Sequence, residues 1–515
     1  MTENQVSKES GDEMFGPFLF ARGGDSTKIR LAALIVAPDG SEIPELRAMD
    51  CDPVSPQKLA TLFGRTYWRF DFELPASADA QYSFGSETYA VCADMGSDLH
   101  IGFVSCNGQE EGDLDRPVEE RNALWADLAE QHKKRPFALL LHGGDQIYAD
   151  GVWHCHPEIE AWLDARRRER LATAFSDEMR DAVLKFYLDH YLTIYNQPQI
   201  AHMLARVPSL MMWDDHDIFD GWGSHKKWFQ GSAVAKGMFA CARDAFCLMQ
   251  LCAAPAADVD LLGVVDPKQQ DAVERKTGLA NKSEHDPLPD MILDRAGRSF
   301  AWRVDYPGMT LIAPDLRSER TPDVIMGDTG WHDLVPALET IPDGNRILLM
   351  STVPVIGPRL SLVEFFLYML PKAQKYEDDL RDQWQSRWHR REWCKMLELL
   401  ERIANDHDHE ITVLSGEIHV ATRGTFETKG KTIHQLVASG ISHTAPPQAF
   451  ARGLGLLAWI GDNPLPNRPT RLKPLPDRKG VYCAARNYLT LSRNDKKWGA
   501  KWHLEGIGWT PDLTI

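Results

Sequence analysis

The sequence predicts a layered α/β protein with two central sheets. Short, continuously apolar segments, which are typical of strands buried on both sides, alternate with amphipathic helices over most of the chain. Strand-like segments that form antiparallel hairpins are predicted before and after this region. A chain of 515 residues, 43% of them hydrophobic and 25% charged, can bury a sizeable core. This composition excludes collagen-like, coiled-coil and wholly disordered proteins.

The chain is predicted to have two parts, a small antiparallel β domain over residues 1–97 and a larger α/β domain over residues 98–515. In the first part the strand-like segments are LAALIVAP at 31–38, TYWRFDFELP at 66–75 and ETYAVCAD at 87–94. Turn-forming residues separate these segments, as expected for hairpins. We expect this part to be structural or to form one wall of a cleft.

Strands and helices alternate after residue 98. Strands are predicted over residues 99–106, 137–144, 209–215, 347–355, 410–419 and 432–440. Helices are predicted over residues 118–133, 177–195 and 384–404, the last with Trp388 facing inward. Residues 226–298 are interpreted as an insertion. Two hairpins are also predicted, one over residues 299–317 with its turn at Pro307-Gly308, and one over residues 481–507.

Charge and composition exclude several classes of function. The 57 Lys and Arg against 74 Asp and Glu give a net charge of −17, which argues against a broad nucleic-acid-binding face. A phosphate-ester substrate is still possible, because bound metal ions can supply positive charge. No apolar run approaches the ~18–20 residues of a membrane helix. The polar, acidic start lacks the pattern of an export signal, so we expect a cytoplasmic protein without membrane attachment.

The nine cysteines contain no CxxC pair. Neither a zinc ribbon nor a disulfide framework is therefore indicated. Reduced thiols are the expected state.

The segment HGGDQIYADG at 142–151 follows a predicted buried strand. Gly143 and Gly144 allow a sharp turn, after which Asp145 emerges. Tyr148 lies one helical turn further on, so its phenol and the Asp145 carboxylate can converge on one point. Hard oxygen donors in this arrangement suit Fe3+, Mn2+ or Ca2+. A capping Asp and a buried Tyr would also explain the segment.

The segment WDDHDIFDGWG at 213–223 places four acidic residues and one His after another strand. So many charges are costly to bury unless a cation neutralises them. A metal site is therefore favoured, with a solvated acidic turn as the alternative. The two residues of interest in this segment are Asp215 and His216.

The segment VLSGEIHVATRG at 413–424 ends a third strand. Glu417 and His419 are two residues apart, so they point to the same side and could bind a metal together. Cys106, in FVSCN, ends a fourth strand and could supply a thiolate, although a small buried hydrophobic residue is an equal explanation. Arg317 and Arg320 follow a further strand, where they could bind a substrate phosphate or form ordinary ion pairs.

These motifs resemble those of the PhoD-like phosphatases, a branch of the calcineurin-like metallophosphoesterase superfamily. The matching segments are SCN at 105–107, GDQIYADG at 144–151, DDHD at 214–217 and SGEIH at 415–419, in the order of the family. The resemblance covers about residues 98–445, and the first part of the chain looks like the β domain that precedes the catalytic part in that family. It implies a four-layer α/β/β/α sandwich that holds a dinuclear metal centre.

The resemblance also implies a set of iron ligands. Asp145 corresponds to the carboxylate that bridges both metals. Tyr148 corresponds to a tyrosinate ligand of Fe3+, and Cys106 stands where PhoD-like members use Cys. His419 would complete this site.

For the second metal, the resemblance implies Asp215 and Glu417 as ligands. His216 corresponds to the His that contacts the substrate phosphate or protonates the leaving group. Glu417 departs from the Asp common in the family, and no His follows the predicted strand near Ser351-Thr352. A water-rich site would suit Ca2+ or Mg2+, with Mn2+ and Zn2+ as other divalent ions.

The function expected from the sequence is therefore metal-dependent hydrolysis of small phosphate mono- or diesters. A hydroxide held at the dinuclear centre would attack phosphorus, with His216 assisting the leaving group. The alternatives are a catalytically silent metal-binding scaffold of the same fold and a hydrolase of non-phosphate esters. The sequence does not fix the oligomeric state.

Overall fold

The computed structural model describes residues 13–49, 51–96, 98–108, 116–255, 299–358, 382–458 and 462–515. It is an α/β structure with three sheets among these residues. Most of its parallel strands are short and fully buried, as the continuous apolar runs predict.

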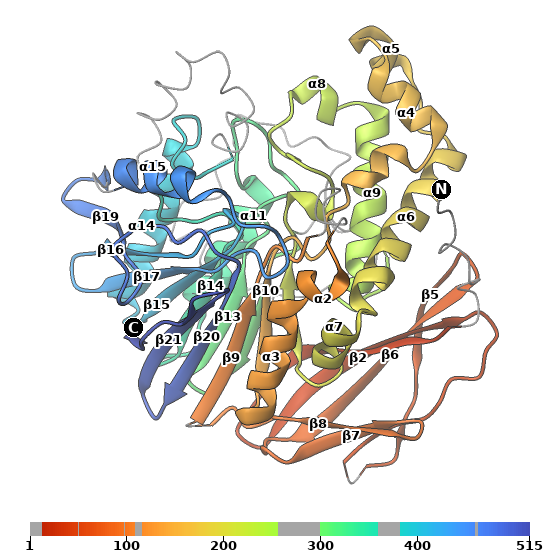
Figure 1. Ribbon diagram of the computed structural model, residues 1–515, viewed down its shortest axis with the longest axis horizontal. Coiled ribbons are helices and arrows are strands. Elements are labelled where there is room, and N and C mark those ends of the chain that lie inside the picture. Colours follow the sequence, from red (N-terminus) through yellow and green to blue (C-terminus); the bar gives the residue numbers. More distant parts are fainter. Residues whose placement is uncertain are drawn as a thin grey trace.

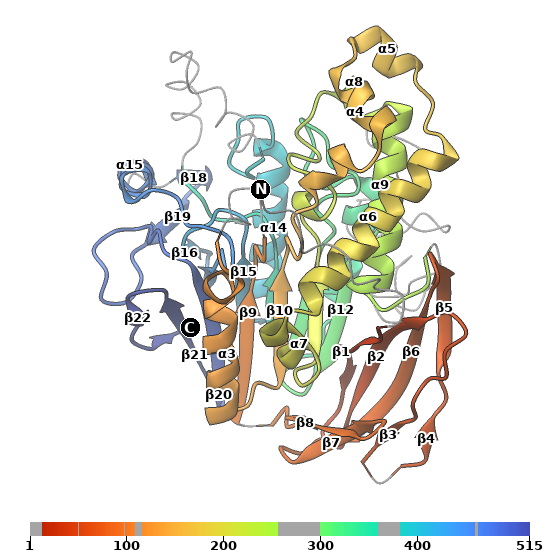
Figure 2. The same ribbon diagram turned by 45° about the vertical axis from the view of Figure 1, so that its right-hand side comes forward.

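The largest sheet has eleven strands in the order β22-β21-β20-β9-β10-β11-β1-β2-β6-β5, with β23 paired to β21. Figure 2 shows most of these strands following one another from β20 to β5. Their bounds are β1 Phe15–Gly24, β2 Lys28–Pro38, β5 Gln57–Leu62, β6 Arg65–Pro75, β9 Asp98–Val104, β10 Leu139–Gly143, β11 Ser209–Met212, β20 Asn487–Asn494, β21 Lys497–Leu504, β22 Gly508–Trp509 and β23 Leu513–Thr514.

The second sheet has eight strands in the order β12-β13-β14-β15-β17-β16-β19-β18. Their bounds are β12 Trp302–Tyr306, β13 Met309–Ala313, β14 Arg346–Met350, β15 Ile411–Ser415, β16 Thr422–Glu427, β17 Thr432–Val437, β18 Asp462–Leu465 and β19 Arg468–Lys473. The third sheet pairs β4 (Pro53–Val54), β3 (Leu46–Ala48), β7 (Ala80–Phe84) and β8 (Glu87–Val91) in that order.

The amino-terminal strands differ from the expected separate β domain. Strand β1 pairs parallel with β11 and antiparallel with β2, so β1, β2, β5 and β6 extend the largest sheet. The physical reason is that β1 buries both of its faces. Phe18 and Phe20 belong to one hydrophobic cluster, whereas Leu19 and Ala21 belong to another on the opposite face. A strand with two buried faces needs neighbours and layers on both sides.

The hydrophobic core has three clusters. The first joins the largest sheet to the helices α3 (Ala123–Lys134), α6 (Asp177–Tyr195), α7 (Pro198–Leu204) and α9 (Ala233–Met249). The second lies between the largest sheet and the eight-stranded sheet. The third joins the eight-stranded sheet to α11 (Asp328–Glu339) and α14 (Arg390–Asp406). Figure 1 shows α6 and α9 together on one side of the molecule and α11 and α14 on the other.

Helix α6 has the bounds that the sequence predicts. The Ser176 hydroxyl accepts the backbone N–H of Met179 at 3.1 Å and caps the first turn, which also carries two acidic residues that suit the helix dipole. Three buried tyrosines, among them Tyr187 and Tyr191, lie on its inner face. The prediction of this helix is confirmed.

Two predicted elements differ. Residues 226–298 are not only a surface insertion, because helix α9 within them packs against α6 in the core. Residues 256–298 lie outside the described residues. Helix α14 begins at Arg390 rather than near Trp384, and the side chain of Trp388 is 49% exposed rather than inward. Among the described residues, no helix has the length and apolar character needed to cross a membrane.

Candidate metal centre

The loops after β9 and β10 bring Cys106 and Asp145 together. The Cys106 Sγ lies 3.5 Å from the Asp145 Oδ2, and both side chains are buried. The Cys106 backbone N–H donates to the Gly144 carbonyl at 3.1 Å, so the two loops are hydrogen-bonded to one another. Both residues have positive φ, 52° for Cys106 and 55° for Asp145, which non-glycine residues rarely adopt. Such backbone strain is concentrated at functional sites.

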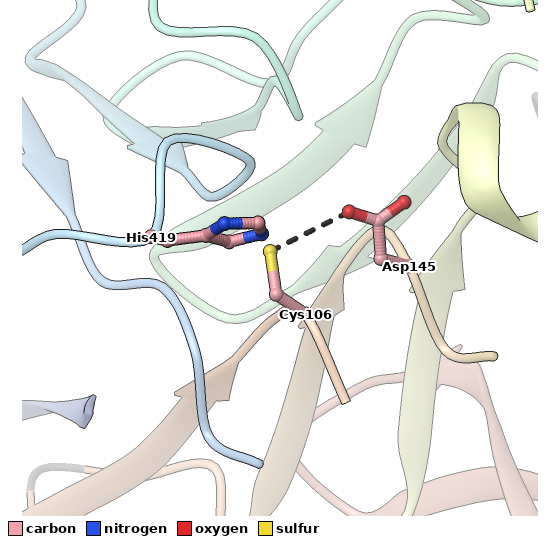
Figure 3. A group of neighbouring side chains, drawn as sticks. All are labelled: Cys106, Asp145 and His419. Carbon is pink, nitrogen blue, oxygen red and sulfur yellow. Dashed lines mark hydrogen bonds between the residues drawn. The ribbon is translucent and has the colours of Figure 1, made fainter. Parts of the chain in front are cut away.

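His419 reaches the same point from the loop after β15. One ligand atom each of Cys106, Asp145 and His419 lies within 4.8 Å of the others, and Figure 3 shows the Cys106 sulfur directed between the other two side chains. The Tyr148 hydroxyl lies 2.9 Å from the His419 Nε2. The structure therefore brings together all four residues expected to bind iron.

The ring of Tyr148 is closely surrounded. A Cβ atom at Gly108 would lie only 1.8 Å from the Tyr148 ring, so glycine is required there. His216 stacks on Tyr148 with a centroid distance of 4.0 Å, and His190 Nε2 donates to the Tyr148 carbonyl at 2.9 Å. These contacts fix the phenol before any ligand binds.

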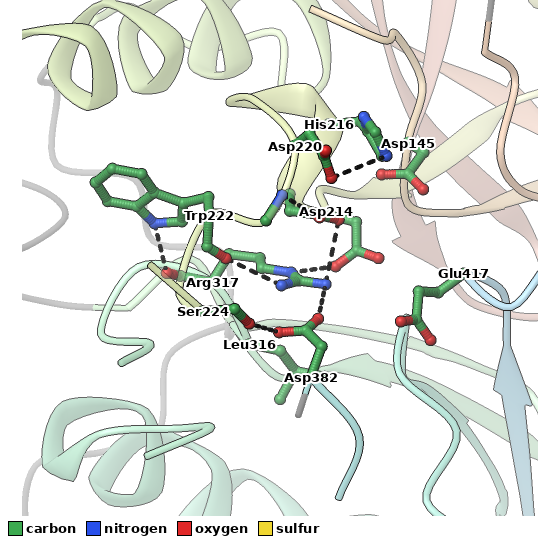
Figure 4. A network of polar contacts seen from close by, with 12 residues as sticks. Asp145, Asp214, His216, Asp220, Trp222, Ser224, Leu316, Arg317, Asp382 and Glu417 are labelled. Atoms are coloured by element: carbon green, nitrogen blue, oxygen red, sulfur yellow. Dashed lines mark hydrogen bonds and ion pairs between the residues drawn. The ribbon is translucent and has the colours of Figure 1, made fainter. Parts of the chain in front are cut away.

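A second cluster shares Asp145. Single carboxylate oxygens of Asp145, Asp214 and Asp215 lie within 4.8 Å of one another. Asp215 was expected here, whereas Asp214 was not singled out. Glu417 is in none of the clusters found among the described residues, and both of its carboxylate oxygens accept hydrogen bonds from the Gln383 side chain at 2.8 Å. Figure 4 shows Asp145, Asp214 and Glu417 around one region.

The electrostatics of the two clusters suit a cation. Asp145 is 1% exposed, and burial, with the negative charges of Cys106 and Asp214 adding to it, raises its pKa well above the usual value. Asp145 Oδ1 and Asp214 Oδ2 are buried and have no hydrogen-bond partner among the residues that the structure describes. Unpartnered buried carboxylate oxygens are costly unless a cation binds them. The donor set of thiol, phenol, imidazole and carboxylates therefore fits metal ions.

The His216 imidazole is hydrogen-bonded to Asp150, a carboxylate that belongs to neither of the two clusters that contain Asp145. Its Nδ1 donates to Asp150 Oδ2 at 2.8 Å, and Asp150 Oδ1 accepts the backbone N–H of Asp220 at 2.8 Å. Burial lowers the pKa of His216, but Asp215 and Asp150 raise it more, so that it lies well above the usual value. The imidazole is therefore suited to carry a proton. Asp215, His216 and Asp220 could also hold a cation by their spacing.

Arg317 and Arg320 form a buried ion-pair network behind this loop (Figure 4). Arg317, which is 0% exposed, contacts Asp214 through its Nε and Asp382 Oδ2 through Nη2 at 2.8 Å. The Arg320 Nε lies 3.0 Å from Asp382 Oδ1. This is the ion-pair alternative that the sequence left open, and contact of either arginine with a substrate stays a prediction.

Three further residues were missed by the sequence analysis. Buried Asp217 accepts backbone N–H groups from the loops after β10 and β11, including those of Asp145 and Asp214. The Ser439 Oγ lies 3.1 Å from the Cys106 Sγ and accepts the backbone N–H of His419 at 2.9 Å. His443 stacks on His419. Ser439 and His443 follow β17 in a segment without a recognisable motif, so the sequence offered no signal for them.

The family described as PhoD related phosphatase matches residues 93–265 and 296–377. The matched ranges include Cys106, Asp145, Tyr148, Asp215 and Arg317, whereas Glu417 and His419 lie beyond them.

The chain is 26% identical over 468 residues to the Saccharomyces cerevisiae protein named uncharacterized protein YGR266W. The match covers 75% of this chain and 63% of that protein, so the chain spans less than two thirds of its length. The solved structure of PhoD is similar in fold, with a TM-score of 0.55 at 12% identity, over 99% of this chain and 90% of that one. Motifs, family match and fold agree, and the chain therefore belongs to the PhoD-related phosphatase family.

Proposed function

We propose that the protein is a phosphoesterase that hydrolyses phosphate mono- or diesters at a dinuclear metal centre. The observation that carries the proposal is that Asp145 belongs to two ligand clusters at once, one with Cys106 and His419 and one with Asp214 and Asp215. A carboxylate shared in this way is suited to bridge two cations.

The ligand chemistry differs between the two clusters. The thiol of Cys106, the phenol of Tyr148 and the imidazole of His419 favour Fe3+ on one side of Asp145. The other side offers carboxylate oxygens, which favour Ca2+, Mg2+ or another divalent cation such as Mn2+ or Zn2+. We also propose that the three core clusters correspond to the four-layer α/β/β/α sandwich of the metallophosphoesterases.

Bound metal ions would supply charge to the phosphoryl oxygens and make hydroxide available at neutral pH. The protein would supply the proton. His216 is held at Nδ1 by Asp150, which fixes the ring and leaves Nε2 to protonate the departing oxygen. Asp150 is outside all of the clusters found among the described residues, so it is free to orient His216.

A catalytically silent scaffold with the same fold is the competing function. The hydrogen-bonded pair of His216 and Asp150 favours an enzyme, because Asp150 helps to keep the imidazole protonated, and a protonated imidazole can donate a proton but cannot bind a metal. A hydrolase of non-phosphate esters is the third function, and hydrolysis of 4-nitrophenyl acetate without hydrolysis of the phosphate esters below would reveal it.

The test is hydrolysis of 4-nitrophenyl phosphate and bis-4-nitrophenyl phosphate by the purified full chain. We expect activity that chelation abolishes and that added Fe3+ with Ca2+ or Mg2+ restores. Asp145→Asn should abolish both activity and the binding of two metal equivalents. Asp181→Asn, on the exposed face of α6, is the matched control and should behave as the wild type. Activity in protein free of metal would contradict the proposal.

A further inference from the structure

His443 touches three of the four residues proposed to bind iron. Its ring stacks on His419 with a centroid distance of 3.7 Å and an interplanar angle of 22°. It also stacks on Tyr148 at 5.1 Å, with an angle of 20°. Its backbone N–H donates to the carbonyl of Cys106 at 3.2 Å.

The orientation of the His443 ring is itself fixed. Nδ1 lies 2.9 Å from the Thr444 carbonyl, and because a carbonyl only accepts, Nδ1 carries the proton and donates. The chain before His443 is tied to the same loop, since Ile441 N–H donates to the Ser105 carbonyl at 3.1 Å. The ring is therefore held by the backbone and presents its faces to its two aromatic neighbours.

Tyr148 and His419 need this support because their ligand atoms must point to the same place. The Tyr148 hydroxyl and the His419 Nε2 are 2.9 Å apart, and a small rotation of either ring would move its ligand atom away from the shared point. His419 also has a positive φ of 52°, so its backbone is not in a relaxed conformation. On Tyr148, the rings of His216 and His443 both stack against the phenol.

We infer that His443 is a positioning residue, whose ring stacking sets the directions of the Tyr148 and His419 ligand atoms toward the metal. This inference rests on the proposed metal centre. It assigns no substrate contact to His443. Removing a group that orients metal ligands lowers metal affinity by about 10- to 100-fold in characterised sites.

The experiment separates the ring of His443 from its hydrogen bond. His443→Phe keeps a ring that can stack, whereas His443→Asn keeps a donor for Thr444 but has no ring. His443→Ala removes both, and His332→Ala, a half-exposed histidine on α11, is the control. The probe is Co2+ added to the metal-free full chain, with the visible cobalt bands and the dissociation constant as readouts.

We expect His443→Asn and His443→Ala to bind Co2+ about 10- to 100-fold more weakly, with shifted visible bands. His443→Phe should restore the affinity and spectrum of the wild type. Thermal unfolding of the metal-free variants should match the wild type, which shows that each is folded. If one variant does not fold, the comparison of the remaining ring-free variant with His443→Phe decides.

Three outcomes overturn the inference. Wild-type affinity and bands in His443→Asn would show that stacking does not position the ligands. Unchanged Co2+ binding with a raised KM for 4-nitrophenyl phosphate would make His443 a substrate contact instead. Failure of the wild type to bind Co2+ would overturn the proposed metal centre itself, and the role of His443 with it.

Discussion

The carboxylate of Asp217 accepts the backbone N–H of Asp145 at 3.0 Å, although 72 residues separate them in the chain. The same carboxylate accepts the N–H groups of Gln146, Ile147 and Asp214. One buried side chain therefore ties the loop after β10 to the loop after β11. Burial raises the pKa of Asp217 to about 7, against the opposing effect of these N–H donors.

We predict that Asp217→Asn destabilises the protein by about 1–3 kcal/mol, because an amide NH2 would face backbone donors and leave them unsatisfied. The free energy of unfolding of the metal-free protein in urea measures this. Asp217→Asn should also weaken binding of both metals, since both loops lose their common acceptor. Asp181→Asn serves again as the control. Unchanged stability together with unchanged metal binding would mean that the loops are held by other contacts.

Tyr148→Phe tests the phenol as a ligand. If Tyr148 binds Fe3+ as tyrosinate, the aerobically purified protein should show a visible charge-transfer band that this variant lacks. The ring contacts with Gly108 and His216 remain, so the fold should not change. Cys106→Ala should instead weaken iron retention while the tyrosinate band of the residual iron persists. A band that survives Tyr148→Phe would remove Tyr148 from the ligand set.

His216→Ala tests the proton donor. We expect both metals to remain bound and the rate for alkyl phosphate esters to fall by about 10²–10⁴-fold, with a smaller fall for 4-nitrophenyl esters, whose leaving group needs little protonation. Asp150→Asn should shift the rates in the same direction, but less, because an amide oxygen can still accept from His216 Nδ1. Steady-state rates for matched alkyl and aryl esters measure both. Equal losses for the two esters would leave His216 with a phosphate-positioning role only.

Asp215→Ala should lose the second metal, because a ligand removed from a largely buried site leaves the cation poorly compensated. Metal content after gel filtration measures this, with Asp220→Ala as a comparison from the same loop. Retention of two equivalents by Asp215→Ala would point to Asp214 as the ligand in its place, because the described part of the chain offers its Oδ2 no hydrogen-bond partner.

Arg317→Met distinguishes the ion pair from a substrate contact. Breaking the buried pair leaves Asp214 without this counter-ion and Asp382 with Arg320 alone, which should cost about 3–5 kcal/mol of stability. Urea unfolding of the variant measures this cost. A variant of wild-type stability with a raised KM would instead place Arg317 at the substrate.

Much of the fold could be predicted from the sequence. The apolar runs at β10, β11 and β15 are long enough to be strands and too short for helices, and α6 carries its own capping residue. The amino-terminal part was predicted less well. Strand β1 pairs with β11, which comes much later in the chain, and no local pattern in the sequence identifies that partner. The start of helix α14 was predicted too early in the chain. Trp384 and Trp388 have helical spacing, but the residues before Arg390 form turns instead of a helix.

By itself, the sequence determined which loops hold the proposed metal ligands. These ligands lie at or just after the ends of predicted strands, each within a short motif: Cys106, Asp145, Tyr148 and His419. The carboxyl ends of parallel strands meet at one edge of a sheet, so such residues are expected to come together. Only the tertiary structure decided which side chains support them. Asp217 contacts Asp145 at the ends of the adjacent strands β11 and β10, and His443 contacts His419 at the ends of the adjacent strands β17 and β15. Contacts of this kind depend on which strands become neighbours in a sheet rather than on any spacing in the sequence.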